Sequence, residues 1–243
     1  MSIKDLPVTE RGPWLATSLG GMWSIQHPDE RDVFIDDIAA GSARTCRYAG
    51  QLRDDIDFFS VAEHAIEMTF WAIENGYVVY LEDALAILLH DASEAYYGDM
   101  PTPLKQLLPD FRVLEDMAQD VIISAFGLNK DNTLITKKTI KEIDNRIRVD
   151  ERPRLIAEPA MSAGHNITWD DGTPMQPLDV TLQCLAPGQA RVAFLNCWVQ
   201  CIDQLPARDP EIYGILKERE GGFRSSLDGL GRGTHLQENE MVI

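Results

Sequence analysis

In several long segments of this chain, apolar residues recur every three or four positions, which is the spacing of one face of an α-helix. No segment of useful length alternates apolar and polar residues as a half-buried strand does. The pattern therefore predicts an all-α protein, a bundle of about six helices around one core. The expected helices span residues 36–49, 60–75, 82–97, 112–126, 134–150 and 188–204.

Two of these segments carry the clearest signals. In residues 60–75, Ser60 and Glu63 form a capping box at the start, and Gly76 marks the end. Residues 82–97 are apolar nearly all round in their first half, which is typical of a central, buried helix.

The 243 residues suffice for one large domain or two small ones, and the shared core favours a single domain over residues 1–218. Its helical core spans residues 33–204. Residues 153–187 contain several prolines and predict an irregular insertion. Residues 219–243 are polar and glycine-rich, which predicts a flexible tail.

The formal net charge of −17 disfavours a protein that binds duplex nucleic acid, because such a protein needs a basic surface. A small anionic substrate would require local positive charge, from a metal or from a few placed Arg and Lys residues. No run reaches the roughly 18 apolar residues of a membrane span. The first residues lack the layout of a signal peptide, so we expect a cytoplasmic protein without a membrane partner.

Four residues are polar at positions that belong to apolar helix faces: His64, His90, Asp91 and Asp144. Taken singly, each could be a satisfied core histidine, a helix cap or half of an ion pair. Together, two imidazoles and two carboxylates make a ligand set for a divalent cation. Such a cation would offset the cost of burying the two aspartates, for which no nearby Lys or Arg obviously compensates.

Glu94 adds a second argument. It follows His90 by four residues and Asp91 by three, so it lies on the same helix face. A carboxylate beside a metal site can orient an attacking water or take its proton. The alternative is a solvated glutamate at a helix end.

The order of these residues resembles the H…HD…D signature of the HD-domain metal-dependent phosphohydrolases. The longer string HDASEAYYGDMPTPLK, residues 90–105, is similar to the 5′-deoxynucleotidase branch of that family. FFSVAEHAI, around His64, resembles the segment of that branch around its first histidine. CRYAGQ, residues 46–51, is similar to a form found in phage and prophage members. The resemblance covers roughly residues 33–150, with a weaker match near 190–203.

The resemblance implies a metal site made by His64, His90, Asp91 and Asp144. One divalent ion is expected, because the remaining histidines lie outside the strongly apolar helices. The mixed set suits manganese, cobalt, zinc, iron(II) or nickel, and magnesium is a further possibility.

The resemblance also implies roles for five other residues. Glu94 would hold and activate the attacking water, and Asp99 matches a second acidic position needed for activity. Arg47 and Tyr48 match an Arg–aromatic pair that contacts the nucleotide, and Lys105 could attract phosphate. On the sequence alone, Arg47 could instead satisfy a helix end, and Asp99 could form a turn.

These features predict an enzyme that hydrolyses (deoxy)nucleoside 5′-phosphates. The leading interpretation is a 5′-deoxynucleotidase that releases phosphate from a deoxynucleoside monophosphate. The alternatives are a phosphohydrolase or triphosphohydrolase of deoxynucleoside triphosphates such as dATP, a hydrolase of a signalling nucleotide, and a non-catalytic nucleotide-binding module. A small nucleotide is the expected partner, and the family likeness suggests a homodimer in the cytoplasm, or in the host cytoplasm if the gene is carried by a phage.

Overall fold

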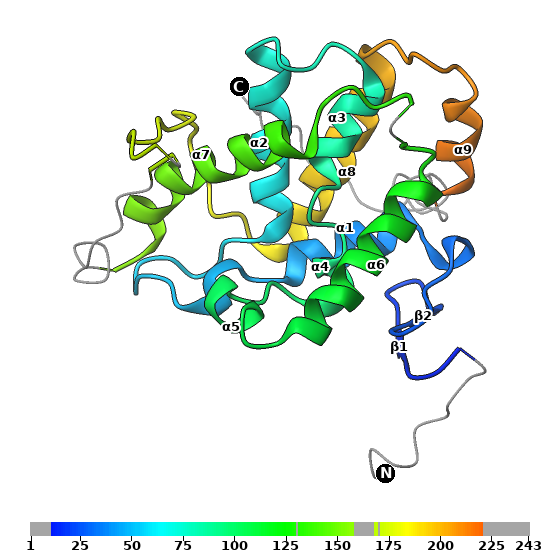
Figure 1. Ribbon diagram of the computed structural model, residues 1–243, viewed down its shortest axis with the longest axis horizontal. Helices are drawn as coiled ribbons and strands as arrows, with labels where there is room; N and C mark the ends of the chain where they lie inside the picture. The colour runs from blue at the N-terminus through cyan, green and yellow to red at the C-terminus, as the bar shows by residue number, and fades with distance from the viewer. Residues whose placement is uncertain (1–10, 130, 158–167, 170, 221–243) are drawn as a thin grey trace, which may run out of the picture.

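The computed structural model describes residues 11–129, 131–157, 168–169 and 171–220, and these form a largely helical body (Figure 1). The all-α prediction is confirmed. Two 3-10 turns, η2 (Glu30–Asp32) and η3 (Arg47–Gly50), join longer elements. The α-helices in the described residues are α1 (Ile35–Arg44), α2 (Val61–Glu74), α3 (Leu81–Leu88), α4 (Glu94–Tyr97), α5 (Thr102–Lys105), α6 (Pro109–Ala125), α7 (Lys137–Leu155), α8 (Pro187–Gln204) and α9 (Ile212–Glu218).

A small hairpin precedes the helices. Its strands β1 (Trp14–Ala16) and β2 (Met22–Ser24) pair antiparallel. Trp23 of β2 is fully buried and stacks on Tyr96 of α4 with 4.0 Å between ring centroids, so the hairpin covers one end of the bundle. The sequence did not predict these strands, because three residues are too few for an alternating pattern to show.

The core lies between α1, α2, α3 and α8, and α2 and α8 each contact the other three helices. Every residue of α3 is buried, which confirms the prediction that this segment is central. Among the described residues, no helix is long and apolar enough to cross a membrane.

Two predicted helices end earlier than expected, and both corrections concern the candidate site. The helix expected over 36–49 stops at Arg44, and the η3 turn that follows holds Tyr48 and Ala49 at φ values of +57° and +53°. The helix expected over 82–97 breaks after Leu88, because both the backbone N–H and the ring Nδ1 of His90 bond to the carbonyl of Ile87. Such a bond tightens the last turn and stops the helix.

The short helix α4 begins where this break ends. It packs against α1 at Gly41. A Cβ at position 41 would lie only 2.3 Å from the backbone carbonyl oxygen of Ala95, so no larger residue fits there. This close approach fixes the position of the neighbouring Glu94.

Further along the chain, α7 continues through Pro153 to Leu155, so the insertion expected over 153–187 begins later than predicted. Residues 158–167 and 170 lie outside the described part, as do residues 221–243 of the expected tail. The backbone N–H groups of residues 183–185 donate to the buried carboxylate of Glu63 at 2.7–2.8 Å, which ties this segment to α2.

Candidate metal centre

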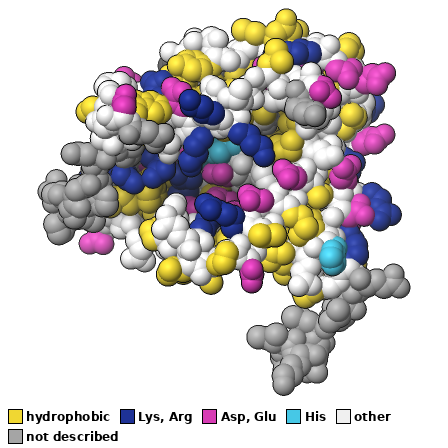
Figure 2. Space-filling model, viewed as in Figure 1, with side chains coloured by type: hydrophobic (Ala, Val, Ile, Leu, Met, Phe, Trp, Pro, Cys, Tyr) yellow, Lys and Arg dark blue, Asp and Glu magenta, His cyan; other side chains and the backbone are white. Residues whose placement is uncertain are grey.

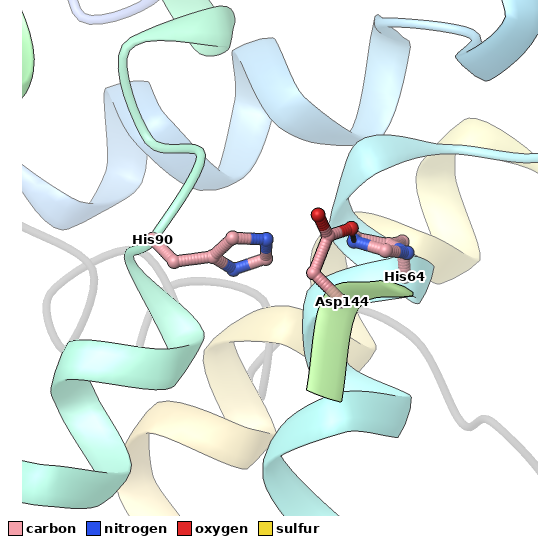
Figure 3. A group of neighbouring side chains, drawn as sticks. All are labelled: His64, His90 and Asp144. Carbon is pink, nitrogen blue, oxygen red and sulfur yellow. Dashed lines mark ion pairs between the residues drawn. The ribbon is translucent and has the colours of Figure 1, made fainter. Parts of the chain in front are cut away.

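His64, His90 and Asp144 come together although they belong to distant parts of the chain. His64 lies on α2, His90 in the turn after α3, and Asp144 on α7. Each offers one donor atom, and these atoms all lie within 4.8 Å of one another. In Figure 3 the Asp144 carboxylate stands between the two imidazole rings. Three of the four predicted ligands therefore form one tight group.

The two imidazoles present the same nitrogen to this group. His90 Nδ1 lies 2.8 Å from the carbonyl oxygen of Ile87, which can only accept a hydrogen bond, so Nδ1 carries a proton. His64 Nδ1 lies 2.6 Å from the Glu151 carboxylate. The Nε2 atoms of both histidines are buried and have no hydrogen-bond partner among the described residues. Because a buried polar atom without a partner is costly, this donor set fits a divalent cation.

Asp91, the fourth predicted ligand, lies at the edge of the group. Its Oδ2 is 3.1 Å from His90 Nε2, and Asp144 Oδ1 is 3.4 Å from His64 Nε2. Bonds of roughly 2.1 Å to one metal place neighbouring ligand atoms roughly 3 Å apart. The Asp91 side chain is 30% exposed, so it faces the open side of the group.

Both aspartates are ionised at neutral pH. Burial opposes ionisation of Asp144, but its contact with His64 and the charge of Lys141 outweigh burial, so the pKa of this carboxyl lies well below its usual range. Burial likewise opposes ionisation of Asp91, and His90 outweighs it, so the pKa of Asp91 is also lowered. Metal ligands need this deprotonated form.

The expectation that no Lys or Arg compensates these carboxylates is wrong. Lys141 Nζ donates to Asp144 Oδ2, and Arg47 Nη1 lies 3.9 Å from Asp91 Oδ2. The Lys141 side chain is 64% exposed, so it can turn toward solvent when a stronger cation binds Asp144. It lies three residues before Asp144 on α7, one helical turn away, so the sequence carried this signal.

Glu94 opens α4 beside the group. Its Oε2 is buried without a hydrogen-bond partner among the described residues, and its Oε1 accepts from Lys105 at 3.3 Å. Burial raises the pKa of Glu94 well above its usual range, and the charges of Asp91 and Asp99 raise it further. Lys105 also donates to Glu115 at 2.7 Å, so its ammonium group is held between two carboxylates.

Arg47 and Tyr48, the predicted nucleotide contacts, both bind Glu151. Arg47 Nη2 donates to Glu151 Oε2 at 3.2 Å, and the Tyr48 hydroxyl donates to the same oxygen at 2.7 Å. Arg47 is only 8% exposed. Their role toward a nucleotide stays a prediction.

Sequence reasoning missed Glu151. This residue lies seven positions after Asp144, two turns along the same face of α7, and its side chain is fully buried. The predicted helix ended at residue 150, one residue before Glu151, so the position of Glu151 on the buried face was not considered.

No family model matches the chain. The uncharacterized protein RCAP_rcc00048 of Rhodobacter capsulatus is 34% identical over 184 residues, which cover 74% of this chain and 91% of that protein. The uncharacterized protein YfdR of Escherichia coli is 41% identical over 97 residues, 40% of this chain and 49% of that protein. The 5′-deoxynucleotidase ECA3034 of Pectobacterium atrosepticum is 29% identical over 113 residues, 40% of this chain and 57% of that protein. The matches to YfdR and ECA3034 thus span about half of each relative. The match to RCAP_rcc00048 spans most of both proteins, and this chain belongs to the same family as RCAP_rcc00048.

Proposed function

We propose that this protein is a metal-dependent phosphohydrolase of the HD-domain type that acts on (deoxy)nucleoside 5′-phosphates. The observation that carries the proposal is the pair of buried Nε2 atoms, on His64 and His90, that converge with the Asp144 carboxylate and have no hydrogen-bond partner among the described residues. The similarity to a protein named 5′-deoxynucleotidase supports it. The leading substrate class is the deoxynucleoside monophosphates, with nucleoside and orthophosphate as products.

In this proposal His64, His90, Asp91 and Asp144 hold one divalent ion. When bound, that ion neutralises charge on the phosphoryl oxygens and makes water more acidic. The four side chains come from α2, α7 and the turn after α3, so the folded bundle sets their geometry before any ion arrives.

Glu94 is the proposed general base. It takes a proton from the attacking water through Oε2, which is buried and has no other partner among the described residues. Lys105 holds the other oxygen and so orients the carboxylate. The new bond joins the water oxygen to phosphorus, the bond from phosphorus to the ester oxygen breaks, and that oxygen leaves with a proton. Asp99 is the acidic residue proposed near the sugar or the leaving oxygen.

The charge around the site suits an anionic substrate although the whole chain is strongly acidic. Arg47, Lys105 and Lys141 each contact a carboxylate of the site. Figure 2 shows Lys and Arg side chains gathered around a hollow in which a histidine is visible. Local positive charge of this kind draws phosphate groups toward a site.

A second candidate, a hydrolase of deoxynucleoside triphosphates, is favoured by two arginines of α7. Arg148 and Arg152 lie one turn apart, and neither forms an ion pair with a carboxylate among the described residues. Both interact electrostatically with Tyr48, beside the site. Two such guanidinium groups could bind phosphates beyond the first.

The experiment is product analysis with a substrate panel. Protein loaded with Mn²⁺, Co²⁺ or Zn²⁺ is incubated with deoxynucleoside mono- and triphosphates, ribonucleoside monophosphates and a generic phosphodiester. Orthophosphate released from monophosphates supports the leading proposal, and tripolyphosphate released from triphosphates supports the second. Absence of turnover with every metal and every nucleotide contradicts both. The homodimer and the cytoplasmic location also stand as proposals, drawn from the family likeness alone.

A further inference from the structure

Glu151 is a buried carboxylate at the centre of three contacts. Its Oε1 lies 2.6 Å from His64 Nδ1, while its Oε2 accepts from the Tyr48 hydroxyl at 2.7 Å and from Arg47 at 3.2 Å. Its side chain is 0% exposed. An isolated carboxylate in this position would be costly, so its persistence depends on these partners.

We propose that Glu151 is a positioning residue that fixes the tautomer of His64, so that the Nε2 facing the metal site carries no proton. The same carboxylate anchors the turn that contains Arg47 and Tyr48 to this site. This inference deepens the proposed function and rests on it for the identity of the site as a metal centre.

Two carboxylates, Glu151 and Asp144, compete for the proton of the His64 ring. A neutral imidazole carries one proton, and an ionised carboxylate can only accept it. Glu151 approaches Nδ1 to 2.6 Å, whereas Asp144 is 3.4 Å from Nε2. The shorter contact holds the proton on Nδ1. If Nε2 carried the proton instead, His64 would hydrogen-bond to Asp144, and neither atom could bind a cation.

The state of Glu151 fits this role. Arg47 and the Tyr48 hydroxyl both donate to its Oε2, so this carboxylate is held as an acceptor toward His64. A carboxylate on the far nitrogen of a metal-ligating histidine orients the ring and makes it a stronger ligand.

The η3 turn holds two residues in a strained backbone conformation. Tyr48 and Ala49 adopt left-handed φ values of +57° and +53°, which are unfavourable for residues other than glycine. Such a conformation persists where its surroundings hold it. The Tyr48 hydroxyl is held by Glu151, and the Arg47 backbone N–H donates to the carbonyl of Phe59 at 2.9 Å. One carboxylate thus links the predicted nucleotide contacts to a predicted metal ligand.

Metal binding by two matched variants tests the positioning role. Glu151→Gln keeps the size of the side chain but removes its charge. Glu63→Gln is the control, because Glu63 is also buried and precedes His64, yet among the described residues its carboxylate accepts hydrogen bonds from the backbone of residues 183–185 and not from His64. Titration calorimetry with Mn²⁺ and Zn²⁺ should show roughly 10–100-fold weaker binding for E151Q. E63Q should stay within about twofold of the wild type.

A measurement on the wild-type protein keeps the inference testable if E151Q does not fold. Long-range ¹H–¹⁵N spectra of the metal-free protein should show His64 protonated at Nδ1. Protonation at Nε2, or unchanged metal affinity in folded E151Q, would overturn the role of Glu151. If the wild type binds no divalent metal while His64 is protonated at Nδ1, the proposed function fails and the tautomer assignment stands.

Discussion

Asp144 and Glu151 lie seven residues apart on α7 and contact different nitrogens of the His64 imidazole. Asp144 Oδ1 is 3.4 Å from His64 Nε2, and Glu151 Oε1 is 2.6 Å from His64 Nδ1. One helix therefore supplies a candidate metal ligand together with the residue that orients a neighbouring ligand. Because a helix is rigid over two turns, the distance between these two groups is fixed before any ion binds.

Replacing one ligand should remove the metal. We expect His64→Ala, His90→Ala or Asp144→Ala to lower the metal content of the dialysed protein to background and to abolish nucleotide hydrolysis, because the remaining donors cannot fill the coordination sphere. His27→Ala is the control, since His27 is exposed and lies outside the group. Elemental analysis gives the stoichiometry. Full metal occupancy in all three variants would contradict the assignment.

Glu94→Gln should separate chemistry from metal binding. The amide cannot take a proton, so we expect kcat to fall roughly 10²–10⁴-fold with little change in metal affinity. Exposed Glu74 on α2 provides the matched control, Glu74→Gln. Steady-state kinetics together with calorimetry decide the matter. E94Q with wild-type kcat would show that another group activates the water.

The sequence predicted the three residues that form the tight group, but not the residues that support them. His64, His90 and Asp144 could be identified because each is a polar residue on a helix face that is otherwise apolar. The apolar residues of such a face recur every three or four positions, so the sequence shows which positions belong to it. Lys105–Glu115 and Arg47–Glu151 join residues whose proximity depends on how helices cross, which periodicity does not encode. The break after Leu88 was also hidden, because it arises from the bonds of His90 to the Ile87 carbonyl rather than from a proline or glycine.

Removing Arg148 and Arg152 should affect triphosphates most. We expect Arg148→Ala combined with Arg152→Ala to raise KM for a deoxynucleoside triphosphate roughly 10-fold or more, since a hydrogen bond to a charged group contributes about 1.5–3 kcal/mol. The KM for monophosphates should change far less. Arg154→Ala is the control, because Arg154 pairs with Asp55. Equal effects on both substrates would argue against a role in binding the distal phosphates.

Glu67 gives a pH-dependent stability prediction. Burial, then the charges of Glu63 and Glu74, raise its pKa from 4.5 to about 7. A raised carboxyl pKa means that the folded state disfavours the ionised form. The resulting destabilisation is absent below pH 4.5, grows as pH rises, and is complete above about pH 7. Glu67→Gln should therefore raise Tm at pH 8 and leave it nearly unchanged at pH 4.5.

Thermal unfolding of wild type and E67Q, measured at the same two pH values, checks the sign. Glu74→Gln should give a smaller gain at pH 8, because it removes only one of the neighbouring charges. A lower Tm for E67Q at both pH values would show that the ionised carboxylate has a stabilising partner instead.

We propose that one divalent ion, held by this group, makes the protein a nucleotide phosphohydrolase. The most direct measurement strips the protein with a chelator and then titrates Mn²⁺ while phosphate release from a deoxynucleotide is followed. We expect no release without metal and full activity at one ion per chain. Hydrolysis that survives removal of the metal, or no hydrolysis at any Mn²⁺ concentration while the site is occupied, would contradict it.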